Sequence, residues 1–181
     1  MLMLAGLMGL MLVGATAFVG LDQADDGEIP GEAPDDSDLQ AGFSSVLLDM
    51  LGAQIMTGTA SDENIAGSEE DDQIGGYSGD DTISGEAGSD YLYGGAGHDL
   101  LDGQAGDDAV HGQDGNDTLA GHSGDDALFG HMGHDLMMGD LDDDTLHGGA
   151  GADALFGGSG DDALHGGLGA DVLTGGDGQD T

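Results

Sequence analysis

A nine-residue repeat runs without insertion from Gly76 to Thr181. Its first complete copy reads GYSGDDTIS and its last reads GGLGADVLT. The first place of this nonad is always Gly, the sixth is always Asp, and the eighth is always Ile, Leu, Val or Met. The fourth place is Gly in every complete copy except one, where Asp142 stands. Four columns held in register over this length predict a regular repeat architecture rather than low-complexity disorder.

The composition excludes an ordinary globular domain. The 181 residues include 38 Asp and Glu, 39 Gly and no Lys or Arg, so the formal net charge is -38 with neutral His. Four Phe, three Tyr and no Trp offer too little large apolar surface for one broad core, and the acidic charges repel one another. Without cationic side chains the chain lacks the usual attraction to nucleic acid and to anionic lipid. We therefore expect no nucleic-acid partner, and a cation as the principal ligand.

Each recurring place of the nonad has a physical reason. Gly at the first and fourth places is expected to give a six-residue turn its positive φ angles, and to bring backbone carbonyls close to a bound ion. Asp at the sixth place supplies a hard carboxylate oxygen. The seventh to ninth places are expected to form a short extended segment whose eighth side chain points inward.

These columns resemble the nonapeptide G-G-x-G-x-D-x-U-x of the repeats-in-toxin (RTX, hemolysin-type) calcium-binding family, over residues 76–181. The resemblance implies an all-β fold, a right-handed parallel β-roll (a β-solenoid) in which two nonads form one coil. It also implies that Ca²⁺ lies between stacked turns, held by sixth-place carboxylates and backbone carbonyls.

The resemblance assigns the metal ligands residue by residue. One edge of the roll would carry Asp81, Asp99, Asp117, Asp135, Asp153 and Asp171. The other edge would carry Asp90, Asp108, Asp126, Asp144, Asp162 and, from the incomplete last nonad, Asp180. The implied carbonyl ligands belong to Gly76, Gly79, Gly85, Gly88, Gly94, Gly97, Gly103, Gly106, Gly112, Gly115, Gly121, Gly124, Gly130, Gly133, Gly148, Gly151, Gly157, Gly160, Gly166 and Gly169. Five gaps on each edge predict up to about ten Ca²⁺ ions, with the weakest sites beside Asp142.

Ca²⁺ is expected to be necessary for folding. Each nonad orders many residues, Gly among them, and buries only one aliphatic side chain in return. We therefore expect coupled binding and folding, with an expanded chain where Ca²⁺ is scarce and a stiff rod where it is millimolar.

The N-terminal residues 1–21 are uninterrupted apolar sequence, long enough as a helix to span a bilayer. A transmembrane anchor is the favoured interpretation of this hydrophobic helix. A cleaved signal fits Ala15-Thr16-Ala17 but lacks a positively charged start, and a buried core helix is the third alternative. An acidic linker is expected over residues 22–42, with Pro30 and Pro34. The need for Ca²⁺ and the absence of Cys favour a bacterial cell-surface or extracellular location.

Two segments precede the regular repeats. Residues 43–57 contain SSVLLDMLGAQIM, whose spacing predicts a short amphipathic helix that caps the roll or binds a partner. Residues 58–75 follow the nonad frame in weakened form, as GTASDENIA and GSEEDDQIG. They lack the fourth-place Gly, so at most one poorly formed coil is expected there.

The ninth-place residues of alternate nonads form a stripe on one outer face, consisting of Tyr93, His111, Phe129, His147 and His165. A structural ladder of stacked rings is the favoured interpretation. A docking strip for a sugar or another roll remains open, as does metal capture by His147 and His165.

The sequence predicts no enzyme. Neither H-E-x-x-H nor G-x-S-x-G occurs, Cys is absent, and carboxylate pairs such as Asp107-Asp108 and Asp161-Asp162 are interpreted as a ligand with a solvated neighbour. Two functions remain. The first is a non-catalytic, calcium-binding surface or secreted protein acting as a spacer, adhesion module or secretion-coupled folding element. The second is the calcium-binding portion of a larger secreted hydrolase or toxin.

Overall fold

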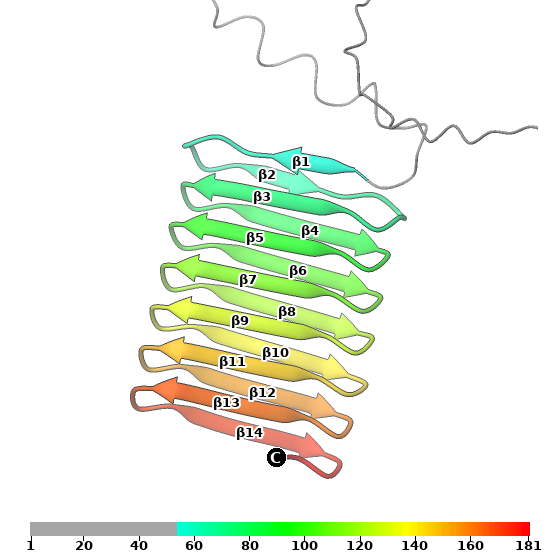
Figure 1. Cartoon of the computed structure of the whole chain (residues 1–181), viewed down its shortest axis with the longest axis vertical. Coiled ribbons are helices and arrows are strands. Elements are labelled where there is room, and N and C mark those ends of the chain that lie inside the picture. Colours follow the sequence, from blue (N-terminus) through cyan, green and yellow to red (C-terminus); the bar gives the residue numbers. More distant parts are fainter. Residues whose placement is uncertain (1–53) are drawn as a thin grey trace, which may run out of the picture. The chain divides into compact units, whose positions relative to one another are not determined.

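The structure is a computed structural model that describes residues 54–181. In this range the chain forms fourteen β-strands and no helix. The strands stack in two parallel sheets of seven, and the chain alternates between them, so each pair of consecutive strands makes one coil (Figure 1). The strands of the two sheets point in opposite directions.

The first sheet contains the odd-numbered strands in chain order. They are β1 (Ile55–Thr57), β3 (Gln73–Ser78), β5 (Tyr91–Ala96), β7 (Ala109–Asp114), β9 (Ala127–Met132), β11 (Thr145–Ala150) and β13 (Ala163–Leu168). The second sheet contains β2 (Asn64–Ala66), β4 (Thr82–Ala87), β6 (Leu100–Ala105), β8 (Thr118–Ser123), β10 (Leu136–Leu141), β12 (Ala154–Ser159) and β14 (Val172–Asp177).

The strand register confirms that two nonads make one coil. Leu92 in β5 pairs with Val110 in β7, and Val110 pairs with Leu128 in β9. Each of these partners is two nonads further along the chain, and the same step relates every strand pair. The implied all-β parallel solenoid is therefore the fold of the described residues.

The core is a double row of eighth-place side chains. From Ile74 to Leu155 these residues are fully buried, and Leu164 is nearly so. Met56 and Ile65 pack against the row from the N-terminal coil. One fully buried aliphatic side chain contributes roughly 1.5–3 kcal/mol, so each nonad gains little from its core alone.

The strands are longer than the sequence predicted. They begin at the seventh place, as expected, but continue through the first three places of the next nonad, as in Thr82–Ala87. The eighth place and the following first-place Gly both face inward and are buried, whereas the seventh and ninth places are more exposed. The turn is therefore confined to the fourth, fifth and sixth places.

The positive φ expected at the first-place Gly is not found. The left-handed region is occupied by the fourth place, where Gly has φ between 119° and 153°, and by the second place, as in Tyr77 at 76° and Gln113 at 86°. The first-place Gly is required by space instead. A Cβ there would lie 2.0–2.5 Å from Oδ2 of the sixth-place Asp, from Gly76 through Gly175.

Most of the predictions for the N-terminal part of the chain concern residues that the structure does not describe. Residues 1–53, which include the hydrophobic segment 1–21 and the acidic linker 22–42, lie outside the described residues. For residues 43–57 the helix prediction is wrong at its C-terminal end, because Ile55–Thr57 pairs with β3 as strand β1. No helix suited to crossing a bilayer is present among residues 54–181.

The fourth-place Gly residues are predicted to be indispensable for stability. In Gly133→Ala, the new Cβ would lie 1.4 Å from the carbonyl oxygen of Gly115, at a φ of 135°. We expect this variant to lose more than about 2 kcal/mol in denaturant unfolding at saturating Ca²⁺. The control is Gly75→Ala, whose Cβ would meet no atom within 4 Å. It should be neutral or gain up to about 1 kcal/mol. Equal stability of the two variants would contradict the structure.

Candidate metal centre

The sixth-place aspartates form two columns, one along each edge of the roll. Their side chains from Asp81 to Asp162 are buried, with exposed fractions of 0–3%. In each column Oδ1 accepts a hydrogen bond from the backbone N–H of the aspartate one coil earlier. Asp99 accepts from Asp81 at 2.8 Å and Asp108 accepts from Asp90 at 2.8 Å. The structure thus brings together the two sets of aspartates that the sequence analysis grouped by edge.

The second carboxylate oxygen has no partner. Oδ2 is buried without a hydrogen bond in ten of these residues, which are Asp81, Asp90, Asp99, Asp108, Asp117, Asp126, Asp135, Asp144, Asp153 and Asp162. Each oxygen lies against the first-place Gly of its own nonad. A buried carboxylate oxygen without a donor or a cation is costly. Repetition of this arrangement along both edges points to a ligand that is a cation.

In the two weakened N-terminal nonads, the sixth-place carboxylate is fully satisfied by hydrogen bonds within the chain. Asp72 occupies the sixth place, and its Oδ2 accepts hydrogen bonds from the N–H and hydroxyl of Ser68, at 2.7 and 3.0 Å. Glu63 likewise accepts from the N–H and hydroxyl of Thr59. The sequence analysis missed both acids as column members, although GTASDENIA and GSEEDDQIG carry an acid at the sixth place. The hydroxyl and N–H of a second-place Thr or Ser satisfy them internally, whereas later nonads have neither Ser nor Thr at that place.

Backbone carbonyls of the turns are the other oxygen atoms beside the columns. In the turns, the third-place and sixth-place carbonyls accept hydrogen bonds from neighbouring coils, as in Gly79 N–H to Ala96 and Leu100 N–H to Asp81. The fourth-place carbonyls accept none of the turn hydrogen bonds found in residues 54–181. The carbonyl oxygen of Gly79 lies against the α-carbon of Gly97, where a Cβ would be 1.9 Å away.

This donor set fits Ca²⁺. Within the described part of the chain, no three His, Asp or Glu side chains converge as a metal-binding group. A cation at a column must therefore combine few carboxylates with backbone carbonyls. Carboxylate and carbonyl oxygens are the ligands that Ca²⁺ prefers, whereas transition metals favour imidazole or thiolate.

The environment of the columns raises the pKa of eight of their carboxyl groups. Burial is the largest cause, and neighbouring carboxylates add repulsion, while a backbone N–H hydrogen bond acts in the opposite direction. The pKa rises to about 7 for Asp108 and Asp144, and to about 6 for Asp117 and Asp126. The pKa is also raised for Asp90, Asp99, Asp135 and Asp162.

The fifth-place residues have a role that the sequence analysis overlooked. Their exposed side chains accept backbone N–H bonds from the coil that follows, the opposite sense to the sixth-place contacts. Asp107 accepts from Asp125 at 3.0 Å, and His98 Nδ1 accepts from Asn116 at 2.9 Å. The neighbour in a pair such as Asp107-Asp108 therefore joins adjacent coils rather than serving only as a solvated charge.

The predicted ring ladder is confirmed on the first sheet. Tyr93, His111, Phe129 and His147 stack in sequence, with centroid separations of 4.7–5.3 Å and interplanar angles of 3–8°. His165 ends the ladder edge-on to His147. His111 and His131 additionally bring ring nitrogens within 3.1 Å of each other.

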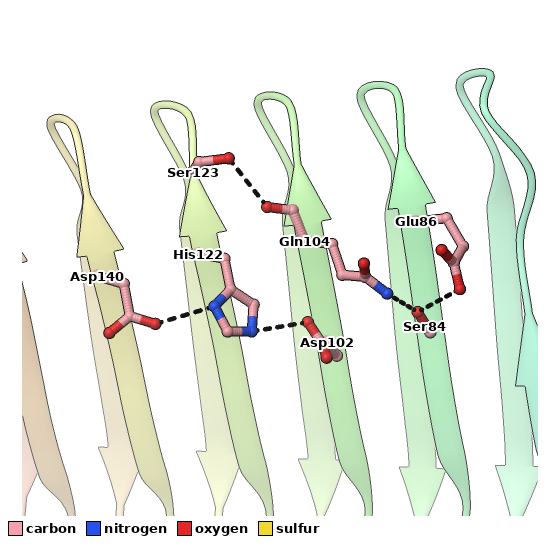
Figure 2. Close-up of polar contacts among 7 residues, drawn as sticks. All are labelled: Ser84, Glu86, Asp102, Gln104, His122, Ser123 and Asp140. Atoms are coloured by element: carbon pink, nitrogen blue, oxygen red, sulfur yellow. Dashed lines mark hydrogen bonds and ion pairs between the residues drawn. The ribbon is translucent and has the colours of Figure 1, made fainter.

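The second sheet carries a polar network that the sequence analysis did not predict. Figure 2 shows His122 of β8 between Asp102 of β6 and Asp140 of β10. Each imidazole nitrogen lies 3.1 Å from a carboxylate oxygen. Gln104 also donates to the hydroxyl of Ser84 in β4. These contacts join four neighbouring strands on the outer face.

Stacked Gly/Asp coils with an aspartate column along each edge define a β-roll of the nonapeptide-repeat class. The model of the RTX calcium-binding nonapeptide repeat family matches residues 57–92, 75–110, 85–119, 111–146 and 147–181. The chain therefore belongs to this family, and the suspected resemblance is confirmed. A search of the curated proteins gave no match.

The raised pKa values predict a specific pH dependence for the Ca²⁺-free roll. A carboxyl group whose folded pKa exceeds its unfolded value binds more protons in the folded state between those two values. The stability that protonation provides is therefore lost as pH rises from about 4 to about 7. In chelator, we expect more β-structure near pH 5 than near pH 8, measured by far-UV circular dichroism.

Binding of Ca²⁺ should show the opposite trend, because the carboxylates must be deprotonated to bind it. The Ca²⁺ concentration at the folding midpoint should fall as pH rises over the same range. A midpoint independent of pH would contradict the assignment of the buried columns as ligands.

Proposed function

We propose that this chain is a calcium-binding, non-catalytic surface or secreted protein whose β-roll folds when Ca²⁺ binds. Membership of the RTX family and the β-roll fold imply calcium binding. The observation that carries the proposal is the set of ten buried Oδ2 atoms without a hydrogen-bond partner. A roll with internally satisfied carboxylates, as at Asp72, would need no cation.

The twelve predicted aspartates are the proposed side-chain ligands, together with first-place and fourth-place Gly carbonyls. Support is strongest for the ten residues whose Oδ2 is unpaired. Asp171 and Asp180 belong to the same columns and accept N–H bonds from Asp153 and Asp162. With these two included, the gaps between turns accommodate up to about ten ions.

Coupled folding follows from the balance of forces in one coil. The core contributes two aliphatic side chains per coil, while the columns bring like charges together at the spacing of adjacent strands. Bound Ca²⁺ supplies positive charge at the columns. The carboxylates and carbonyls of neighbouring turns then hold one ion jointly, which ties one coil to the next.

This behaviour suits a protein that crosses a membrane as an unfolded chain and becomes rigid in calcium-rich surroundings. We propose that the roll acts as a spacer, adhesion module or secretion-coupled folding element outside the cell. The acidic composition and the absence of Cys support such a location. Anchoring through residues 1–21 stays a prediction, because that segment lies outside the described residues.

Two isosteric substitutions test the assignment of the ligands. Asp126→Asn removes the charge of a carboxylate whose Oδ2 has no hydrogen-bond partner. Asp72→Asn removes the charge of a carboxylate in the same column whose Oδ2 accepts hydrogen bonds from Ser68. Since Asp126 borders a gap on each side, isothermal titration calorimetry should show a loss of about two Ca²⁺ ions. The folding midpoint in Ca²⁺ should rise.

The Asp72→Asn variant should keep the parent stoichiometry. Retention of full stoichiometry by Asp126→Asn, or equal losses in the two variants, would overturn the assignment.

A further inference from the structure

Among residues 54–181, the ring ladder of the first sheet ends at Tyr93, and no further ring stacks on its second face. One face of Tyr93 stacks on His111, with centroids 4.9 Å apart and planes 7° from parallel. The residue that pairs with Tyr93 on the opposite side is Gly75 of β3, and the next is Thr57 of β1. The position where the next ring of the ladder would stand is therefore a hollow.

Nothing in the backbone requires Gly at this position. Gly75 is the one glycine in residues 54–181 at which an added Cβ would meet no atom within 4 Å. Its φ also lies outside the left-handed region. A ring-bearing side chain would fit there, as it does at the equivalent positions of β5, β7, β9, β11 and β13.

The hollow is part of an open groove of about 550 Å³. Small-molecule sites commonly have volumes of about 300–1,000 Å³. At the second place of the nonads on this sheet, Gly95 of β5 lies between Tyr77 of β3 and Gln113 of β7. Because Gly95 has no side chain, the groove also extends over this position. Tyr77 is 64% exposed. Thr57 and Tyr93 are two strands apart, about 9.5 Å between backbones, which leaves room for one ring.

The residues that line the groove indicate which kind of ligand it would bind. The open face of Tyr93 suits a flat apolar surface, while Thr57, Tyr77 and Gln113 place hydroxyl and amide groups around it. These groups both donate and accept hydrogen bonds, as a ring edged with hydroxyl groups requires. The lining has no cationic side chain and includes Asp114, so it disfavours an anionic ligand.

The geometry points to a binding site for a neutral sugar ring in this groove, termed here the Gly75 groove. A pyranose would stack its C–H face on Tyr93 in the position of the missing ladder ring. Its hydroxyl groups would then reach Thr57, Tyr77 and Gln113. An aromatic side chain of a protein partner would match Tyr93 but would leave those polar groups unpaired.

Saturation-transfer difference NMR on the full chain in saturating Ca²⁺ tests this assignment. The probes are glucose, galactose, mannose and their β-linked disaccharides, with p-cresol as an aromatic probe. We expect transfer to the ring C–H protons of at least one sugar, with a dissociation constant on the order of 1 mM. Circular dichroism of each variant verifies that the roll is folded.

Four variants locate the site. Gly75→Phe should fill the hollow and weaken sugar binding at least about tenfold, as should Tyr93→Ala. Tyr93→Phe keeps the stacking surface and should retain binding. Tyr91→Phe, at an exposed position outside the groove, should leave binding unchanged. These patterns would support the proposal.

Three results would overturn it. They are no transfer to any sugar by the folded protein, sugar binding unaffected by Gly75→Phe, and binding of p-cresol alone. Calorimetry with Ca²⁺ on the same samples reports calcium binding separately, so failure of the sugar site is distinguishable from failure of the proposed function.

Discussion

Two lines of buried carboxylate oxygen run along the edges of the roll, and the rest of the structure is organised around them. Each sixth-place Asp uses one oxygen to accept the N–H of the preceding coil, as Asp117 does from Asp99. In the ten residues from Asp81 to Asp162, the other oxygen faces the first-place Gly and has no donor. The same residue therefore joins adjacent coils and carries a charge that the protein alone does not neutralise.

Glycine makes this arrangement sterically possible in two ways. At the first place it leaves space for the inward-facing carboxylate, because a Cβ would occupy the position of Oδ2. At the fourth place it adopts positive φ and lets one turn stack directly on another, as Gly133 does on Gly115. Asp142 shows the limit of this rule. It has a φ of 74°, well below the 119–153° of the fourth-place glycines, so its turn has adjusted to accommodate a side chain.

The strict nonad period predicted the inward-facing eighth place. With the resemblance to the RTX family, which implies two nonads per coil, it also predicted the register, the two aspartate columns and the ring ladder. The sequence was insufficient wherever a contact depends on local backbone geometry. The predicted strand length and the positive φ expected at the first place were wrong, because places one to three continue the strand. The hydrogen bonds of Asp107, the pairing of His122 with two carboxylates and the internally satisfied Asp72 depend on residues outside the repeated columns. Ile55–Thr57 joins the sheet because β3 offers it an edge, which overrides its helical spacing.

We propose that the roll has insufficient cohesion until a divalent cation binds to the columns. Far-UV circular dichroism of the full chain at neutral pH, recorded in chelator and then during titration with Ca²⁺, tests it most directly. We expect an unfolded spectrum in chelator and a cooperative, saturable gain of β-structure with Ca²⁺, while Mg²⁺ at the same concentration produces little change. A chain that is already fully β-structured in chelator would contradict it.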